Sequence, residues 1–559
     1  MNLPGYPTKI TRKFLLKSGE WPVWQSSEHM QLDAFQEQDM FGEPCPAPRG
    51  ALVLPLLWTY MVKTEGIYKA RCCCNGSPSR YGSSSIAHTY AAALEQPGSR
   101  LFWGLAAIKN LLVYGSDASN AFAEAPPPID PFYVAVDTQF REWWKAQGKP
   151  DIPRGYVLPV KHALQGHPES PRLWATKIHG ILKTLGFKAT THEPCLYIGT
   201  INGEKCYFLR QVDDFAVAAP SEDTALSIIR KIGAYLKKPL KELGLLERFN
   251  GIDIVQSRHY NKIHCGTYIN KIIAAHGWEN TALTREVHTP MRSDSAYQTS
   301  LETAVRPLTS DKAHEIASNM GFSYRQAIGE LIFAAVTCRI DILYAVIKLS
   351  QYSSSPAAVH FTAVKNIFRY LRTHPDKGLH FWRTQPNHDP PNMPFPDIRP
   401  DNYVLTPNHH DAGTLYGYVD SDWAGDKSHR RSISGAGIIF AGACIAYFSK
   451  HQVTITLSST EAEFVAACDA AKTCLYIRTM LEELDLEQEN ATIIYEDNNG
   501  ALLMANAQRP TRRTCHLDIR HFSLLDWVQF DLILLYAILT HDNASDTYQS
   551  FSTYLIMAS

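Results

Sequence analysis

Apolar residues in the central part of the chain recur with a helical period. They fall every three or four positions between Ile328 and Ala335, and again between Ala363 and Leu371. This spacing gives a helix one apolar face that can pack against a core. Residues 320–373 are therefore predicted to be mainly helical.

Shorter apolar stretches upstream predict strands and helices in alternation. Leu111–Tyr114 and Cys206–Ala219 have the continuous apolar character of buried strands. Pro171–Leu185 and Thr224–Leu236 have the length and apolar spacing of helices. Pro239 predicts a stop after the second of them, because proline cannot continue a helix.

The composition changes between residues 384 and 413, where proline, asparagine and histidine are frequent, as is typical of a linker. Residues 414–550 follow as a separate unit. Strands come first there and then alternate with helices, an order that favours an α/β sheet domain. The predicted elements are strands at Gly417–Asp420, Ser434–Phe440 and Ile493–Tyr495 and helices from about residues 460 and 500.

The length of 559 residues corresponds to about three to four globular units. Hydrophobic residues make up 45% and charged residues 19%, which excludes a globally disordered chain. The formal net charge of −1 gives no overall support for nucleic-acid binding, so a basic groove would depend on local clusters. Such clusters lie within residues 230–241, 365–372 and 509–513, and each alone is more typical of a solvated face.

Twelve cysteines without metal-ligand or disulfide spacing are typical of reduced thiols in an intracellular protein. The first residues lack the basic-then-apolar layout of a signal peptide. The apolar runs Ala51–Trp58 and Leu532–Leu539 are too short to span a bilayer. We therefore expect no membrane association and a cytoplasmic location, with the nucleus as the alternative.

Two adjacent aspartates, Asp213 and Asp214, interrupt an otherwise apolar stretch. Buried like charges repel each other and are costly to desolvate, so the pair fits best at the tight turn of a hairpin. Asp117 stands at the end of another predicted strand, with Phe122 five residues later. Taken alone, the aspartate pair fits a polar hairpin tip as well as it fits a metal site.

Together with their surroundings, these segments resemble the reverse transcriptase region of copia-type LTR retrotransposon Pol polyproteins, over about residues 20–380. Six segments occur in the family's order: Lys69-Ala-Arg71, Asp117-Ala-Ser-Asn-Ala-Phe122, Leu164 to Trp174, Gln211-Val-Asp-Asp214, Arg339 to Val346 and Leu349-Ser-Gln351. The resemblance implies an α+β and α/β multidomain fold. In it, the fingers, palm and thumb of a right-hand polymerase are followed by a connection and a ribonuclease H-like domain.

The resemblance also implies the chemistry of the first site. Asp117, Asp213 and Asp214 would hold two Mg²⁺ ions, with Mn²⁺ as the alternative, about 3.5–4 Å apart. Carboxylate oxygens are the hard ligands that Mg²⁺ prefers, and the bound ions would offset the mutual repulsion of the acids. One ion would activate the primer 3′ oxygen and the other would clamp the leaving pyrophosphate.

Three further residues are assigned by the same resemblance. Lys69 and Arg71 would bind the incoming deoxynucleoside triphosphate, and Phe122 would lie under its sugar and exclude a 2′-hydroxyl. By themselves they also fit an exposed basic pair and a core aromatic. Two positions depart from the family: Gln211 replaces an aromatic beside the template–primer, and Glu169 replaces a glutamine that helps to place the nucleotide. That glutamine's role is therefore not transferred.

Acidic residues also recur in the unit after the linker. Asp420, Glu461, Asp497 and Asp546 match the four acids of the ribonuclease H domain that follows the polymerase in this family. The match at Asp546 is loose, and Asp518 is the runner-up for the fourth acid. Asp497 alone also fits a helix N-cap. The implied reaction is two-metal hydrolysis of the RNA in an RNA–DNA hybrid.

The helix that begins near residue 460 leaves the role of Glu461 open to a second interpretation. A capping box fits its start twice, as Ser458 with Glu461 and as Thr460 with Glu463. Glu461 shares a helix face with apolar residues three and seven positions on, which predicts that it points inward. The alternative for Glu461 is a plain helix-capping acid.

The complete assignment divides the chain into an N-terminal segment leading into the fingers (1–65), fingers and palm (66–270), a mainly helical thumb and connection (271–383), the linker (384–413), a ribonuclease H-like domain (414–550) and a tail (551–559). Expected partners are an RNA template, a DNA primer, RNA–DNA hybrid and deoxynucleoside triphosphates. The resemblance also suggests virus-like particles and other products of a longer polyprotein.

Two alternatives to this function stay open at the level of sequence. The first is a catalytically inactive or domesticated remnant that binds nucleic acid. The second is another metal-dependent phosphoryl-transfer enzyme, such as a DNA-templated polymerase. The ribonuclease H-like half argues against the second, because removal of an RNA template is useful mainly where RNA is copied.

Overall fold

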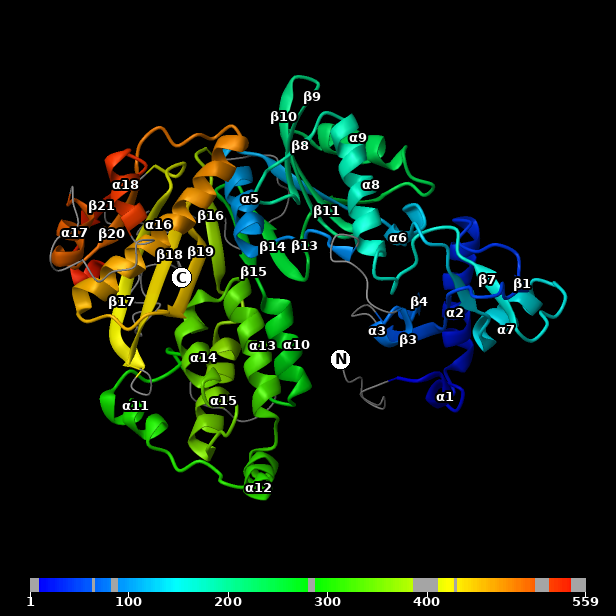
Figure 1. Ribbon diagram of the computed structural model, residues 1–559, viewed down its shortest axis with the longest axis horizontal. Helices are drawn as coiled ribbons and strands as arrows, with labels where there is room; N and C mark the ends of the chain where they lie inside the picture. The colour runs from blue at the N-terminus through cyan, green and yellow to red at the C-terminus, as the bar shows by residue number, and fades with distance from the viewer. Residues whose placement is uncertain are drawn as a thin grey trace.

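The computed structural model describes residues 10–62, 66–81, 89–279, 287–385, 411–426, 430–507 and 522–543. Figure 1 shows the N-terminal elements (blue) at one end of the molecule and the C-terminal unit (yellow to red) at the other, beside a helical segment (green). Within the described parts, no helix combines the length and the apolar character needed to cross a bilayer. The mixed α/β multidomain fold predicted from the sequence is confirmed.

A six-stranded sheet occupies the centre of the first 250 residues. Its strands, in spatial order, are β12 (Lys241–Leu245), β5 (Leu112–Asp117), β11 (Asp214–Ala219), β10 (Glu204–Gln211), β9 (Leu196–Ile201) and β8 (Lys188–Ala189). Phe215 and Val217 of β11 belong to one buried cluster, whereas Ala216 and Ala218 belong to another. Alternate residues of a strand point to opposite faces, so this apolar strand is buried on both sides.

Helices cover both faces of this central sheet. Helices α8 (Ser170–Thr184) and α9 (Glu222–Gly233) contribute to the cluster of Phe215, and helix α5 (Gln96–Ile108) contributes to the cluster of Ala216. The two helices predicted upstream of the linker are thus confirmed as α8 and α9. Helix α9 ends before Pro239, in agreement with the predicted stop.

The N-terminal end contains two smaller sheets and several short helices. Strands β3 (Leu56–Val62) and β4 (Tyr68–Cys74) form an antiparallel hairpin, and helix α2 (Trp21–Glu37) packs against β4. A four-stranded sheet has the order β1 (Cys45–Pro46), β7 (Tyr156–Pro159), β6 (Tyr133–Ala135) and β2 (Val53–Leu54). The remaining helices here are α1 (Arg12–Leu15), α3 (Pro78–Tyr81), α6 (Ala121–Glu124) and α7 (Thr138–Ala146).

The segment after the central sheet is mainly helical, which confirms the prediction for residues 320–373. Its helices are α10 (Gly266–Ala275), α11 (Ser295–Glu302), α12 (Ser310–Met320), α13 (Tyr324–Thr337), α14 (Leu343–Ser350) and α15 (Ala358–Thr373). A four-stranded antiparallel sheet accompanies them, in the order β13 (Arg248–Phe249), β14 (Ile252–Gln256), β15 (Tyr260–His264) and β16 (Gly378–Trp382).

A buried ion pair lies at the turn between α13 and α14. Arg339 donates from Nε and Nη2 to the two carboxylate oxygens of Asp341 at 2.9 and 2.8 Å, and neither side chain is exposed to solvent. Tyr370 donates to the same carboxylate at 2.8 Å, and Arg339 donates to the His374 carbonyl at 2.8 Å. All charges are therefore paired, so the sequence segment that begins at Arg339 has a structural role.

We expect the Asp341→Asn substitution to lower the free energy of unfolding by about 3–5 kcal/mol, because it leaves Arg339 buried without its counter-ion. Burial is the largest single influence and would raise the pKa of Asp341, but the charge of Arg339 and the hydrogen bonds from Arg339 and Tyr370 together outweigh it and hold the pKa below its usual value. The carboxylate therefore stabilises the fold above its unfolded pKa, and this contribution is lost as the pH falls through the folded pKa. Urea unfolding should show the full loss of unfolding free energy in the variant at pH 7 and a smaller loss below about pH 4. An equal loss at both pH values would contradict the pairing of Asp341 with Arg339.

The C-terminal unit is a five-stranded sheet with the order β19 (Ala443–His451), β18 (Arg431–Phe440), β17 (Tyr416–Asp426), β20 (Thr492–Glu496) and β21 (Ile533–Ala537). The first three strands are antiparallel, whereas β17, β20 and β21 run parallel. Its helices are α16 (Ser459–Glu483), α17 (Asn499–Ala505) and α18 (Ser523–Gln529), followed by the short turn Thr540–Asp542. The predicted strands and helices of this unit are confirmed, and β19 and β21 add to them.

Arg100 of α5 joins the C-terminal unit to the rest of the molecule. Its side chain is 2% exposed and donates to the Thr337 carbonyl at 3.0 Å, the Ile445 carbonyl at 3.2 Å and the Tyr447 hydroxyl at 2.9 Å. The guanidinium also lies 4.4 Å from the centre of the Tyr447 ring. One continuous apolar cluster includes α5, α13 and β19. The two units on either side of the predicted linker are therefore packed directly against each other.

Two candidate carboxylate sites

The first acidic pair lies at the tip of the hairpin between β10 and β11. Gln211 pairs with Asp214, which leaves Val212 and Asp213 as the two turn residues. Val212 has a φ of 55°, an unfavourable conformation for a β-branched residue. Two bonds hold the turn: the Trp174 indole donates to the Val212 carbonyl at 2.6 Å, and the Ala118 amide donates to the Asp213 carbonyl at 2.9 Å. The tip thus has a fixed conformation.

Asp117 lies directly across from this tip. It is the last residue of β5 and is the register partner of Asp214 on β11. Residues that face each other across an antiparallel pair have Cβ atoms only about 4.5–5.5 Å apart. Within the residues that the structure describes, three ligand atoms converge to within 4.8 Å only at the second site. At the hairpin, a shared ion would therefore require a carboxylate to turn toward its neighbours.

The residues assigned to the nucleotide lie on two separate elements. Lys69 and Arg71 are two positions apart on β4, so their side chains leave the same face of the strand, and both are half-buried. Phe122 lies on α6, five residues after Asp117, and is half-buried against the core of α8 and α9. Phe122 therefore packs against the core as an ordinary core aromatic does, and part of its ring stays accessible.

The two departures from the family pattern are both engaged in contacts within the protein. The Gln211 side-chain carbonyl accepts a hydrogen bond from the Leu94 amide at 3.2 Å. Glu169 is 4% exposed, accepts from the Tyr81 hydroxyl at 3.1 Å and lies 3.6 Å from Arg172. Each departure thus has a structural partner, so neither is by itself a sign of decay.

In the C-terminal unit, the first glutamate of helix α16 caps the helix. The Glu461 amide donates to Ser458 Oγ at 3.2 Å, and the Glu461 carboxylate accepts from the Leu457 amide at 2.7 Å. The structure therefore places the Glu461 carboxylate at the start of the helix, outside the group of converging carboxylates, and its role as a metal ligand stays a prediction. Its carboxylate accepts from the amide of the residue that precedes the N-cap, an arrangement similar to a capping box.

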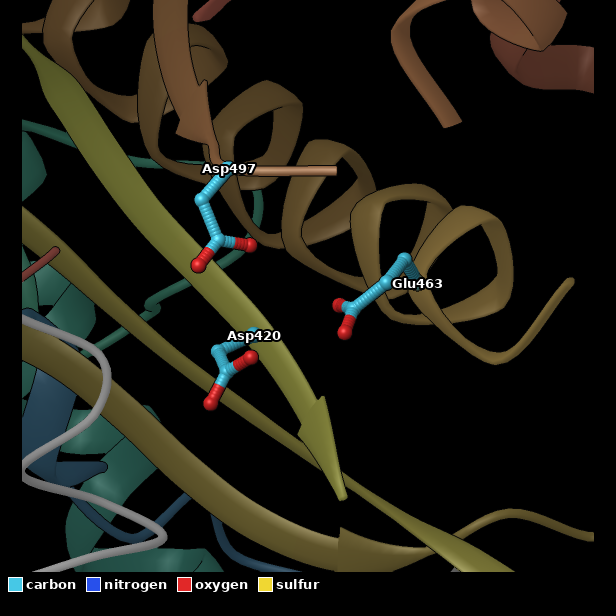
Figure 2. Close-up of side chains that lie close together, drawn as sticks. All are labelled: Asp420, Glu463 and Asp497. Carbon is cyan, nitrogen blue, oxygen red and sulfur yellow. The ribbon is translucent and has the colours of Figure 1, made fainter. Parts of the chain in front are cut away.

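Glu463 is the glutamate of α16 that lies beside Asp420 and Asp497. Ligand oxygens of Asp420, Glu463 and Asp497 all lie within 4.8 Å of one another. Figure 2 shows the three carboxylates gathered in one place, with Asp420 on β17, Glu463 on α16 and Asp497 just after β20. The parallel pairing of β17 with β20 brings the two aspartates to the same edge of the sheet.

The direction of each glutamate follows from what its helix face contacts. Cys468, seven residues after Glu461, lies 4.0 Å from Ser523 at the start of α18. Cys474, eleven residues after Glu463, lies 3.8 Å from the position that a Cβ on Gly417 of β17 would occupy. Both faces of α16 are buried, but only the face of Glu463 meets the sheet that carries Asp420.

The second site is strongly unfavourable for three negative charges. Burial, followed by the charges of Glu496 and Asp420, raises the pKa of Glu463 to about 10. Glu463 is 5% exposed, and one of its oxygens is buried without a hydrogen-bond partner. A divalent cation prefers hard oxygen ligands and offsets such repulsion, so this donor set fits Mg²⁺ or Mn²⁺.

Comparison with known proteins places the chain in a family. Residues 45–292 match the reverse transcriptase (RNA-dependent DNA polymerase) family. A retrovirus-related Pol polyprotein from transposon TNT 1-94 of Nicotiana tabacum is 26% identical over 509 residues, which cover 89% of this chain. The corresponding polyprotein from transposon RE1 of Arabidopsis thaliana is 25% identical over 94% of this chain. Residues 45–292 therefore match the reverse transcriptase family, and most of the chain is similar to copia-type retrotransposon Pol polyproteins.

The chain spans about a third of the length of those relatives, 34% of the first and 32% of the second. Among solved structures, a foamy viral protease-reverse transcriptase in complex with double-stranded DNA aligns with 92% of this chain and 69% of its own. That alignment has 13% sequence identity and a TM-score of 0.44. The resemblance to copia-type Pol polyproteins that the sequence motifs indicate is thus confirmed by the sequence relatives.

The two candidates for a fourth acid in the C-terminal unit, Asp546 and Asp518, both lie outside the described residues. The described chain ends at Asn543, whose side chain is 2% exposed and donates to the Val419 carbonyl at 2.9 Å. Val419 precedes Asp420 directly. The chain therefore reaches the neighbourhood of Asp420 three residues before Asp546, so Asp546 stays the prediction for the fourth acid.

Proposed function

We propose that this chain is an RNA-directed DNA polymerase with an associated ribonuclease for RNA–DNA hybrid, acting in retrotransposon replication. The observation that carries the proposal is the presence of two separate carboxylate sites in one chain. Asp117 faces the Asp213–Asp214 tip across β5 and β11, and Glu463 meets Asp420 and Asp497 on another sheet. Paired carboxylates of this kind suit two-metal phosphoryl transfer.

In the polymerase site, Asp117, Asp213 and Asp214 would hold the ions, and the fixed hairpin turn would present them to the primer terminus. Bound Mg²⁺ supplies charge neutralisation at the attacking and leaving oxygens. Lys69 and Arg71, which leave one face of β4, would bind the triphosphate, where fixed cationic donors match the charge that develops. Phe122 would lie under the sugar and exclude ribonucleotides.

In the ribonuclease site, Asp420, Glu463 and Asp497 would hold the ions, and the bound metal supplies the activated water. The Glu463 oxygen that lacks a hydrogen-bond partner supports this role, because a buried, unsatisfied carboxylate oxygen is costly unless a cation is bound. The chain would select hybrid over DNA duplex through duplex shape and 2′-hydroxyl contacts. The proposed partners are thus an RNA template, a DNA primer, their hybrid and deoxynucleoside triphosphates.

The proposed setting follows from the family. We propose action in the cytoplasm, within virus-like particles and beside other products of the polyprotein, with the nucleus as the alternative. The competing function is an inactive remnant that grips nucleic acid. The internal partners of Gln211 and Glu169 favour the active enzyme, because both departures are accommodated by specific contacts.

The intact chain with Mg²⁺ should extend a DNA primer on an RNA template and, in the same reaction, shorten the RNA strand. Denaturing gels with separately labelled primer and template follow both products. EDTA should stop both, because each proposed site depends on a divalent cation. A folded chain that binds hybrid duplex but gives neither product would instead support the inactive remnant.

A further inference from the structure

Helix α2 completes the free edge of strand β4. Ser27 is 5% exposed, and its Oγ accepts a hydrogen bond from the Ala70 amide at 2.8 Å and donates to the Tyr68 carbonyl at 3.1 Å. The other edge of β4 is paired with β3 along its whole length. A strand edge presents unpaired donors and acceptors, and here one helix side chain satisfies one of each.

The next residue of α2 holds the partner strand. Glu28 is 1% exposed, and its carboxylate accepts hydrogen bonds from the Tyr60 hydroxyl and, at 3.1 Å, from Arg12 Nε. Tyr60 lies on β3 as the register partner of Ala70. Ser27 and Glu28 thus fix both strands of the hairpin at the same level.

Aromatic packing reinforces these polar contacts. Trp24 of α2 is fully buried, and its ring meets the edges of Tyr60 and Tyr68 at centroid distances of 5.7 and 4.9 Å. Edge-to-face pairs of this kind have a defined geometry. The helix therefore sets the orientation of the hairpin and does not merely cover it.

The face of β4 away from these contacts carries the two cations. Lys69 and Arg71 alternate with the buried residues Ala70 and Cys72, so the bonds at Tyr68 and Ala70 determine where both cationic side chains leave the strand. Helix α2 itself precedes residues 45–292, the part that matches the reverse transcriptase family. The contacts nevertheless make α2 part of the same structural unit.

We propose that α2 positions the triphosphate-binding hairpin, with Ser27 as the residue that fixes β4 and Glu28 as the residue that fixes β3. The proposal rests on the proposed polymerase function, in which Lys69 and Arg71 bind the incoming nucleotide. Ser27 touches no substrate; it acts through the backbone between the two cations and is a positioning residue.

The test uses the intact chain with the Ser27→Ala substitution. Small displacements of substrate-positioning groups cost up to about 100-fold, so we expect the KM for deoxynucleoside triphosphate to rise about 10- to 100-fold. The kcat at saturating nucleotide should change much less, and hybrid cleavage by the other site should be unchanged. Ser27→Thr, which keeps the hydroxyl, should restore the KM. Met30→Ala is the matched control, because Met30 is 59% exposed on the same helix.

A double-mutant cycle with Arg71→Met separates positioning from general support of the fold. If Ser27 acts through the cations, Ser27→Ala should raise the KM much less in the Arg71→Met chain than in the native one. Equal effects in both chains, an unchanged KM in Ser27→Ala, or parallel loss of hybrid cleavage would overturn the proposal. A native chain that binds template–primer but does not extend it would instead overturn the polymerase function itself.

Discussion

Glu463→Gln should abolish hybrid cleavage and leave primer extension intact. Glu463 is the most deeply buried of the three converging carboxylates. The neutral amide of the glutamine that replaces it can neither balance a cation's charge nor bind the cation as tightly. Loss of a group in the outer shell of a metal site alone costs about 10- to 100-fold, so loss of a ligand should reduce the cleavage rate by more than about 100-fold. The rate is measured with an end-labelled RNA strand in a preformed hybrid.

Glu461→Gln is the matched control, since it removes the same charge two residues away on the same helix. Glutamine can still accept the hydrogen bond from the Leu457 amide, so the helix start should keep its cap. Cleavage should stay close to the native rate. The reverse pattern, with Glu461→Gln inactive and Glu463→Gln active, would show that the helix carries its ligand on the other face.

Asp213→Asn and Asp214→Asn should each abolish primer extension and spare hybrid cleavage. Asp214 faces Asp117 across the sheet and Asp213 occupies the adjoining turn, so either amide would remove a charged ligand from the proposed site. We expect the extension rate to fall by more than about 100-fold, by the same reasoning as for Glu463. Single-nucleotide incorporation on an RNA template measures the effect.

Asp223→Asn controls for the loss of one negative charge away from the site, because Asp223 is exposed in the first turn of α9, beyond the end of β11 opposite the tip. It should extend primers normally. Loss of cleavage together with extension in the hairpin variants would contradict two separate sites, provided that the variants unfold at the native temperature.

The hairpin and its acids were predictable because their pattern conflicts with burial. Two adjacent charged residues inside an apolar stretch are costly to bury, and a turn is the position in the fold where this cost is lowest. The register of β11 with β5, which sets Asp214 opposite Asp117, depends on pairing between segments about 100 residues apart. The pairing of these two segments was expected from the resemblance of their motifs to a known family. The period of their apolar residues did not predict it.

The orientation of helix α16 could not be predicted from its sequence pattern. A helix with one buried face shows its orientation in its sequence, but α16 contacts the sheet on one side and α17 and α18 on the other. Glu461 and Glu463 both fit a capping box and both lie on buried faces. Only the tertiary contacts of Cys468 and Cys474 distinguish the two faces, so the choice required the structure.

Helix α2 was missed for a related reason. Its buried side chains include Ser27 and Glu28, which interrupt the apolar stripe by which an amphipathic helix is recognised. Their burial is compensated by partners on β3 and β4 that lie more than 30 residues away. A polar residue that is buried for a specific long-range contact has no local signature in the sequence.

Crystals of the intact chain with an RNA template, a DNA primer and Mn²⁺ would locate bound cations in an anomalous difference map and so test the proposal of two metal sites. We expect peaks at two places, one in contact with Asp117 and the Asp213–Asp214 tip and one in contact with Asp420, Glu463 and Asp497. A bound duplex with no peak at one of these acid groups, or with a peak at Glu461 and none at Glu463, would contradict it.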